Sequence, residues 1–281
     1  MPTELFLVFY QRVFSRIKSI HRLSFDMTRL FCNLPLSIGA TLDLPEEKAR
    51  HVSVLRLSAG ENVTLFDGKG GQYQAKIIKT DRKRTTVEIL SFVPEEMELP
   101  YTVILAQALP EAGKMDWIVE KAVELGVKEI IPVAAQRSVV RLNADRTEKR
   151  MARWRSLIVS AAEQCGRNTL SVLGEPVGLA AFLKKPSTPY RLLFSPRGKT
   201  SLAAWAVEQI PQSVTLLIGP EGGFSPEEEE LALQNGVTLL SMGPRVLRTE
   251  TAGLAAVSAL NALWEAASTH LLSKAPYERT D

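Results

Sequence analysis

Three apolar runs in the second half of the sequence each end at or near a proline, and this repeated ending constrains the fold more than any other feature. The runs are YRLLFSP, SVTLLIGP and VTLLSMGP, and segments with helical spacing follow them at about 200–209, 226–235 and 250–269. Strands that alternate with helices form a parallel sheet whose faces the helices cover. We therefore predict an α/β domain, in which ligands bind at the carboxyl ends of the strands.

The same alternation begins at about residue 100. YTVILAQAL is a continuous apolar run, as expected of a buried parallel strand, KMDWIVEKAVELG has helical spacing, and VKEIIPVAA is the next strand candidate. A long helix is expected over about 144–164. The predicted α/β domain therefore covers residues 100–272, and residues 273–281 form a short tail.

Residues 27–96 have a β-type pattern instead. Two short apolar runs, Val63–Phe66 and Tyr73–Ile78, flank the hairpin signal DGKGG; TTVEILSF follows as another strand, and no long helical pattern interrupts the region. We predict a small β-barrel-like domain, joined to the α/β domain by VPEEMELP. Residues 1–26 are interpreted as an extension upstream of a natural start at Met27 or as a loose tail, with an amphipathic targeting peptide as the alternative.

The composition argues against several classes of protein. The two cysteines are far apart, which argues against a disulfide framework and a Cys-based zinc site and fits a reducing compartment, and the three scattered histidines show no metal-ligand spacing. No apolar run approaches the roughly 20 residues that span a bilayer. The formal net charge is only +3, so any attraction to nucleic acid must come from local basic patches.

A glycine-rich turn separates strand from helix in LLIGPEGGFSPEEEELALQ, residues 216–234. Ser225 and Glu228 predict a capping box, with Pro226 at the first helical position. The acidic residues 227–230 complement the helix dipole but would repel a bound phosphate, and the loop has neither a Walker nor a GxGxxG pattern. The turn is therefore predicted to contact a ligand that is not anionic, such as a nucleoside or a cation.

A second Gly-Pro pair, Gly243-Pro244, ends the next strand and leads into RVLRTETAGLAAV. Thr249 or Thr251 is expected to cap the last helix. Because both loops follow the carboxyl ends of strands, we predict that they form opposite walls of one crevice.

Taken together, LLIGPEGGFSPEE and MGPRVLRTETAGLAAVSAL closely resemble the two signature loops of the bacterial 16S rRNA (uridine-N3) methyltransferase family. HVSVLRLSAGENVTLFDGKG is similar to its PUA-like domain, GKMDWIVEKAVELGVKEIIPV to its first helix and following strand, and AAEQCGR, residues 161–167, to its central motif. The resemblance covers roughly residues 27–270, and the 26 residues before it depart from the family pattern.

The resemblance implies a SPOUT-type α/β fold, a parallel sheet with a C-terminal trefoil knot, preceded by a small PUA-like RNA-binding β-barrel. It implies S-adenosylmethionine as cofactor and methylation of N3 of one uridine in the 16S rRNA of the small ribosomal subunit. It also implies a homodimer in the cytoplasm, with no metal and no membrane. Knots are rare in proteins and the pattern of apolar residues does not indicate one, so the prediction of a knot depends on the resemblance alone.

The resemblance further implies which residues form the site. Those expected to shape the cofactor pocket are Leu217, Ile218, Gly219, Glu221, Gly222, Leu240, Met242, Gly243, Leu247, Thr249 and Ala252. Uridine N3 is a poor nucleophile until its proton leaves, so Glu250 or Glu221 is the candidate base and Arg248 the candidate stabiliser of the anion. A structural ion pair between Arg248 and Glu250, or proton loss directly to water, is the alternative.

Basic residues predict an RNA-binding surface, because clustered Lys and Arg contact phosphates. The candidates are Arg50, His51, Arg56, Arg150, Arg153 and Arg167. The alternative for the basic segment 137–155 is a solvated helix face.

Three other functions stay open at this point. One is a knotted 2′-O-methyltransferase of rRNA or tRNA, whose nucleophile is a ribose hydroxyl. Another is an RNA-binding protein whose α/β domain has lost catalysis, against which the intact signature loops argue. The last is a nucleotide-dependent enzyme of the doubly wound class, which the missing phosphate motifs disfavour.

Overall fold

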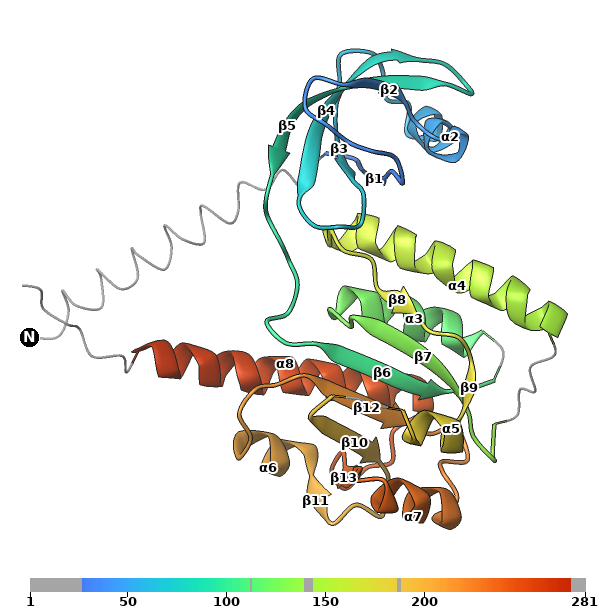
Figure 1. Ribbon diagram of the computed structural model, residues 1–281, viewed down its shortest axis with the longest axis vertical. Helices are drawn as coiled ribbons and strands as arrows, with labels where there is room; N and C mark the ends of the chain where they lie inside the picture. Colours follow the sequence, from blue (N-terminus) through green and yellow to red (C-terminus); the bar gives the residue numbers. More distant parts are fainter. Residues whose placement is uncertain (1–26, 112, 139–143, 186–187, 274–281) are drawn as a thin grey trace, which may run out of the picture. The chain divides into compact units, whose positions relative to one another are not determined.

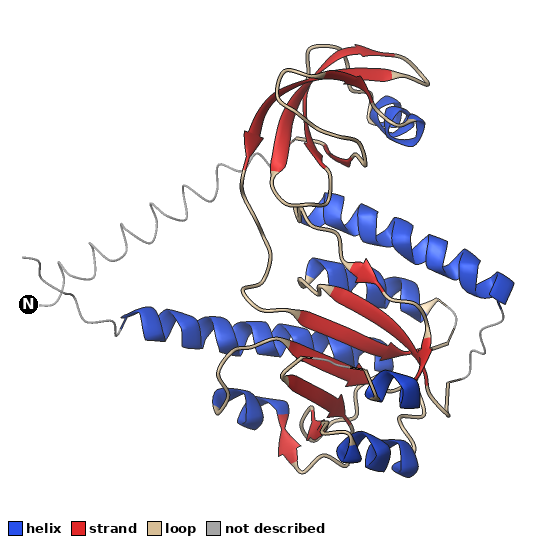
Figure 2. Cartoon of the chain, viewed as in Figure 1, coloured by secondary structure: helices blue, strands red, loops and turns tan. Residues whose placement is uncertain are grey.

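The computed structural model describes residues 27–111, 113–138, 144–185 and 188–273 of the chain (Figures 1 and 2). They form two compact units. The first contains the described residues up to Asp67 together with Gly71–Glu95, and the second contains Gly68–Gly70 together with the described residues from Glu96 onward. The predicted extension over residues 1–26 and residues 274–281 of the predicted tail lie outside the described residues, and Ser273, predicted to begin that tail, is the last residue of a helix.

The N-terminal unit is built on a mixed sheet of five strands in the order β1-β3-β4-β5-β2. The strands are β1 Arg29–Phe31, β2 Thr41–Asp43, β3 Asn62–Phe66, β4 Gln72–Thr80 and β5 Thr85–Val93. β1 and β3 are parallel, and the other neighbours are antiparallel. The hairpin predicted around DGKGG is the antiparallel β3–β4 pair, and alternate residues such as Val63, Leu65 and Ala75 form the buried core.

A helix that the sequence pattern did not predict lies between β2 and β3. This is α2, Glu46–Val54, which follows Pro45 and carries two acidic residues in its first turn. Of its apolar residues only Ala49 and Val52 are buried, so its apolar periodicity is too weak to stand out. Beyond its C-terminus Arg56 adopts a left-handed conformation with φ 59°, a position at which glycine is usual.

The C-terminal unit contains the predicted α/β sheet, and every strand pairing in it is parallel. The order is β11-β13-β10-β12-β6-β7-β8, with β9 also paired to β7. The strands are β6 Val103–Ala108, β7 Glu129–Ala134, β8 Val172–Leu173, β9 Val177–Gly178, β10 Tyr190–Phe194, β11 Thr200–Ser201, β12 Val214–Ile218 and β13 Thr238–Ser241. The prediction of a parallel α/β domain preceded by a small β domain is confirmed.

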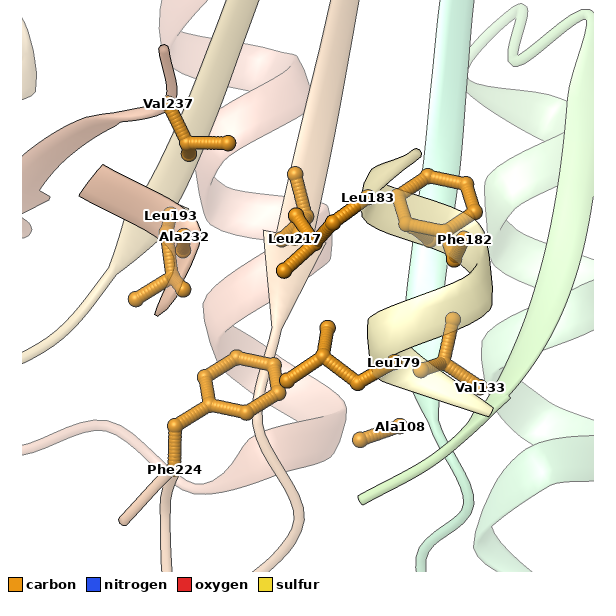
Figure 3. Packing of buried hydrophobic residues seen from close by; sticks show 11 residues of the cluster. Ala108, Val133, Leu179, Phe182, Leu183, Leu193, Leu217, Phe224, Ala232 and Val237 are labelled. Atoms are coloured by element: carbon orange, nitrogen blue, oxygen red, sulfur yellow. The ribbon is translucent and has the colours of Figure 1, made fainter. Parts of the chain in front are cut away.

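Helices cover both faces of this sheet (Figure 1). They are α3 Lys114–Glu124, α4 Ala144–Cys165, α5 Leu179–Leu183, α6 Leu202–Val207, α7 Pro226–Gln234 and α8 Thr249–Ser273. α5 and α7 pack on one face, where Leu217, Leu193 and Phe182 belong to one buried cluster (Figure 3). α8 packs along β6 and β12 and contacts α3 and α6, on the opposite face. Successive strand residues point to opposite faces, so Leu217 faces α5 while Ile218 lies near Gly253 of α8.

The order of three neighbouring strands fixes where a site can form. β12 lies between β10 and β6, and β13 pairs with the other edge of β10. The register places Phe194, the last residue of β10, beside both Ile218 and Leu240. The loops after β10, β12 and β13 therefore leave the sheet at the same edge. The trefoil knot implied by the resemblance stays a prediction.

Gly198, in the loop after β10, packs against the backbone of β13. A Cβ there would lie 2.3 Å from the carbonyl carbon of Leu240, so an alanine requires backbone movement. We expect Gly198→Ala to lower the free energy of unfolding by about 1–3 kcal/mol, measured by chemical denaturation. Gly178→Ala is the matched control, because its φ is −67° and no atom lies within 4 Å of the added Cβ. Equal losses in the two variants would contradict this packing.

Candidate active site

A pocket of about 490 Å³ lies in the C-terminal unit, at the carboxyl edge of the parallel sheet. Its walls come from the loops after β10, β12 and β13 and from the first turn of α8. Lys114 at the start of α3 and Arg137 after β7 also line it. The two Gly-Pro loops thus border one pocket, as predicted, and a third loop, which follows β10, adds another wall.

Nine of the eleven residues predicted for the cofactor line this pocket. They are Ile218, Gly219, Glu221, Gly222, Met242, Gly243, Leu247, Thr249 and Ala252. Leu217 and Leu240 do not line it: both side chains are fully buried in the sheet, and Leu217 packs in the core beneath α5 and α7. Alternation along β12 explains the difference, because Leu217 and Ile218 cannot face the same side of the sheet.

The turn after β12 depends on a close approach between its own backbone atoms. A Cβ on Gly219 would lie 3.0 Å from the Cα of Gly223, and Gly223 itself has φ 65°. The N–H of Gly223 donates to the carbonyl of Pro220 at 2.8 Å, which closes the turn. Arg137 Nη1 donates to the carbonyl of Gly222 at 2.8 Å. Small residues are therefore required here, whatever the ligand.

The acidic block after this turn has local partners. The predicted capping box is confirmed: Ser225 Oγ accepts from the N–H of Glu228, and Glu228 Oε2 accepts from the N–H of Ser225. Glu228 Oε1 also accepts from the N–H of Gln136 at 2.7 Å. Glu229 is buried and pairs with Arg197. These carboxylates serve the start of α7 and its neighbours.

A buried hydroxyl joins the two signature loops. Thr249 Oγ1 donates to the carbonyl of Gly219 at 2.6 Å and accepts from Gln107 Nε2 at 2.9 Å. The N-cap of the last helix was expected at Thr249 or Thr251. Because α8 begins at Thr249, the residue before it, Arg248, holds the cap position. The Thr249 hydroxyl bonds across the sheet edge instead. Gln107, at the end of β6, was not foreseen as part of the site.

A lysine and three carboxylates meet beside the pocket. Lys114 Nζ lies 2.7 Å from Glu221 Oε1, 3.6 Å from Glu111 Oε2 and 3.8 Å from Glu250 Oε2. Burial raises the pKa of Glu221, but the hydrogen bonds from Lys114 and from backbone N–H groups outweigh it, so the pKa lies below the usual 4.5. The hydrogen bond to Glu221 likewise raises the pKa of Lys114. Both groups are therefore charged at neutral pH.

Glu250 and Arg248, two of the candidate catalytic residues, are not bonded to each other. Both line the pocket, and within the described part of the chain the ion partner of Glu250 is Lys114. The alternative of a structural Arg248–Glu250 ion pair is therefore wrong. Glu250 Oε2 is buried and, among the described residues, has no hydrogen-bond partner. That oxygen has an unused acceptor, whereas Glu221 Oε1 already accepts from Lys114 and from the N–H of Glu111.

The residues predicted to bind RNA occupy several elements. Arg50 and His51 are exposed on α2, and Arg56 is exposed just beyond it. Arg150 is half-buried and Arg153 is exposed, both on α4. RNA contact by these five residues stays a prediction.

Arg167 requires a correction. Its side chain is only 2% exposed, and it forms a two-pronged ion pair with Glu98, with N···O distances of 2.8 and 2.6 Å. Its Nη1 also donates to the carbonyls of Val123 and Val127 and to Ser171 Oγ. A guanidinium fully occupied in this way ties the end of α3 to neighbouring segments and is not available to an RNA phosphate.

Several pocket residues were missed by the sequence analysis. They are Lys114, Arg137, Phe194, Ser195, Pro196, Arg197, Pro220, Phe224, Glu229, Arg245 and Val246. A signal existed for the segment around Pro196, because its strand ends at a proline like those of the two signature loops.

Two features are absent from the described residues. No helix there is both long and apolar enough to cross a membrane. In the same ranges no group of three or more His, Cys, Asp and Glu side chains is arranged to hold a metal ion.

Two family models match the chain. The RNA methyltransferase domain matches residues 97–261, which contain the parallel sheet and the pocket. The RNA methyltransferase PUA domain matches residues 44–90, within the N-terminal unit. Fold, pocket and models together define an RNA methyltransferase.

Individual relatives narrow this class. Ribosomal RNA small subunit methyltransferase E of Bacillus subtilis is 32% identical over 247 residues, which cover 84% of this chain and 96% of that protein. The protein of the same name from Synechocystis sp. is 32% identical, covering 81% of this chain and 75% of the relative. A crystal structure of ribosomal RNA small subunit methyltransferase E from Neisseria gonorrhoeae, bound to S-adenosyl methionine, is 38% identical with a TM-score of 0.79 and covers 85% of this chain and 98% of that one. The chain belongs to the ribosomal RNA small subunit methyltransferase E family.

The Thr249 hydroxyl can be tested by an isosteric change. Thr249→Val removes the bond to Gly219 and leaves two buried polar groups without this partner, so we expect a loss of about 1–3 kcal/mol in the free energy of unfolding. Thr251→Val, on the exposed side of the same helix turn, is the control and is expected to change stability by less than about 0.5 kcal/mol. Chemical denaturation measures both. If the Thr249 variant were as stable as the control, the hydroxyl would not hold the loops together.

Proposed function

We propose that this chain transfers the methyl group of S-adenosylmethionine to N3 of one uridine in the 16S rRNA of the small ribosomal subunit. The observation that carries the proposal is the pocket at the carboxyl edge of the sheet, where the two signature loops meet a lysine and two carboxylates. The bound S-adenosyl methionine of the Neisseria gonorrhoeae relative supports the choice of cofactor.

The residues present fit this cofactor. A volume of about 490 Å³ falls within the range of pockets for small ligands. Gly219, Gly222 and Gly243 allow a ligand to approach the backbone, and the nine pocket residues named above would hold it. The cofactor supplies an activated methyl group on a positively charged sulfonium. Glu221 and Glu250 provide negative charge in the same pocket, which suits the cationic sulfonium.

We assign the proton transfer to Glu250. Uracil N3 must lose its proton before its lone pair can form the new bond to carbon, and a carboxylate with an unused acceptor can take that proton. Glu250 Oε2 is such an acceptor, whereas Glu221 Oε1 is engaged by Lys114 and the N–H of Glu111. Glu221 is therefore proposed to position Lys114. Lys114 and Arg248 are proposed to offset the negative charge that develops on the uracil oxygens.

The wider context is also part of the proposal. We propose that the enzyme works in the cytoplasm as a homodimer and that its PUA domain contributes to RNA binding through Arg50, His51 and Arg56. Arg150 and Arg153 on α4 would contact phosphates as well, and of the two Arg153 is already paired, with Nε 2.5 Å from Asp116 Oδ2. The family-model match to an RNA methyltransferase PUA domain supports the role of the N-terminal unit.

The activity is tested by mapping methylated nucleosides by mass spectrometry after incubation with small subunits that lack the modification. We expect 3-methyluridine to form with S-adenosylmethionine. A 2′-O-methylated nucleoside, or no methylation, would contradict the proposal. We expect Glu250→Gln to lower kcat about 100-fold or more because the proton acceptor is lost, with cofactor affinity little changed. Glu208→Gln, an exposed change of the same charge at the end of α6, should retain the wild-type rate.

RNA binding by α4 is tested by the salt dependence of affinity. Arg150, which has no ion partner among the described residues, is compared with Arg155, which lies 3.4 Å from Glu175 and 3.9 Å from Glu148. If Arg150 neutralises a phosphate, Arg150→Ala should lower the slope of log affinity against log salt by about 0.7–0.9. Arg155→Ala should lower the slope less, because carboxylates already neutralise that side chain. An unchanged slope for Arg150→Ala would remove it from the proposed RNA surface.

A further inference from the structure

Arg197 lines the pocket from the loop after β10, and its guanidinium is held on one side only. Nε donates to Glu229 Oε2 at 2.8 Å, and Nη2 lies 2.8 Å from Glu229 Oε1. Nη2 also donates to the carbonyl of Phe224 at 3.2 Å. Glu229 is buried on α7, so the carboxylate that orients the guanidinium is itself fixed by packing.

The backbone that carries Arg197 is anchored as well. The N–H of Ser195 donates to the carbonyl of Leu240 on β13 at 2.9 Å. The N–H of Arg197 donates to Ser195 Oγ at 3.2 Å, and the N–H of Gly198 donates to the carbonyl of Ser195 at 3.0 Å. Gly198 lies so close to β13 that a Cβ would overlap its backbone. Both ends of the side chain are therefore fixed before any ligand arrives.

The third nitrogen of this guanidinium is unused. Among the described residues, Nη1 of Arg197 has no hydrogen-bond partner, and the side chain is 52% exposed although it is pinned at Nε and Nη2. A guanidinium that keeps one amino group available and cannot rotate loses little entropy when it binds an oxygen anion. Because Glu229 offsets the positive charge of the Arg197 guanidinium, the direction of the free N–H groups, more than the charge, would determine which oxygen anion binds.

We propose that Arg197 is an oxyanion-binding residue of this pocket, with Nη1 donating to a carboxylate or phosphate oxygen. The proposal rests on the proposed function, because both proposed ligands carry such a group. The amino-acid end of the cofactor has a carboxylate, and the RNA around the target uridine has phosphates. Glu229 acts through Arg197 and is a positioning residue.

The experiment compares two ligands that differ in the carboxylate. S-adenosylhomocysteine carries the amino-acid end, and 5′-methylthioadenosine has the same nucleoside and thioether without it. If Arg197 binds the cofactor carboxylate, Arg197→Met should lower the affinity for S-adenosylhomocysteine about 10-fold or more and leave the affinity for methylthioadenosine unchanged, both measured by calorimetry. If it binds an RNA phosphate, both nucleosides should bind as in the wild type, and the salt slope for a 16S rRNA fragment should fall by about 0.7–0.9.

Two further variants keep the result interpretable. Lys184→Met removes the same charge from an exposed site outside the pocket and should bind all three ligands as the wild type does. Arg197→Met leaves the buried Glu229 without its partner, so the double variant Arg197→Met, Glu229→Gln is measured beside it, with thermal melting as the check on folding.

The outcomes separate this proposal from the proposed function. If the wild type binds S-adenosylhomocysteine and rRNA but the folded Arg197 variants bind every ligand equally well, the oxyanion role is overturned while the function stands. Equal losses for S-adenosylhomocysteine and methylthioadenosine would also overturn it, because the effect would not depend on the carboxylate. If the wild type binds neither S-adenosylhomocysteine nor rRNA, both proposals fail.

Discussion

The buried hydroxyl of Thr249 connects the elements from which the pocket is built. It donates to the end of β12 at Gly219 and accepts from Gln107 at the end of β6, while its own backbone begins α8. A buried hydrogen bond contributes modestly when made but costs more when one partner is left alone, so the three elements are tied to one arrangement. The close turn at Gly219 and the start of α8, where Arg248 and Glu250 lie, are both positioned through it.

The acidic block that follows the glycine turn is best understood through its partners. Glu228 caps α7 and accepts from the N–H of Gln136, and Glu229 orients Arg197. These two carboxylates are used in building the walls of the pocket. By contrast Glu250, in the first turn of α8, retains a buried oxygen without a hydrogen bond among the described residues. The local sequence is acidic for structural reasons, and the carboxylate best suited to proton transfer lies elsewhere.

What the sequence predicts well is local, and what it misses depends on contacts between distant residues. The capping box at Ser225 and Glu228 follows from spacing alone, because its partners are three residues apart. The third wall at Arg197 depends on β13 pairing with β10, which no local pattern specifies. Arg167 was predicted to bind phosphate because its partner Glu98 is 69 residues away and no local pattern in the sequence connects the two. α2 was not predicted because only two of its apolar side chains are buried, which leaves too weak an apolar periodicity in the sequence.

Two of the five cationic side chains that line the pocket are paired with carboxylates, whereas Arg137, Arg245 and Arg248 have no ion partner among the described residues. Lys114 is held by Glu221, and Arg197 is held by Glu229, so neither cation adds a large uncompensated field. A phosphate that binds at a helix N-terminus needs that end to be unobstructed, and the start of α7 is capped by Ser225 and Glu228. A ligand with one cationic and one anionic group can instead use an acceptor on one side and a donor on the other. S-adenosylmethionine has both groups, and the unused acceptor of Glu250 and the unused donor of Arg197 are the complementary features that the two proposals assign.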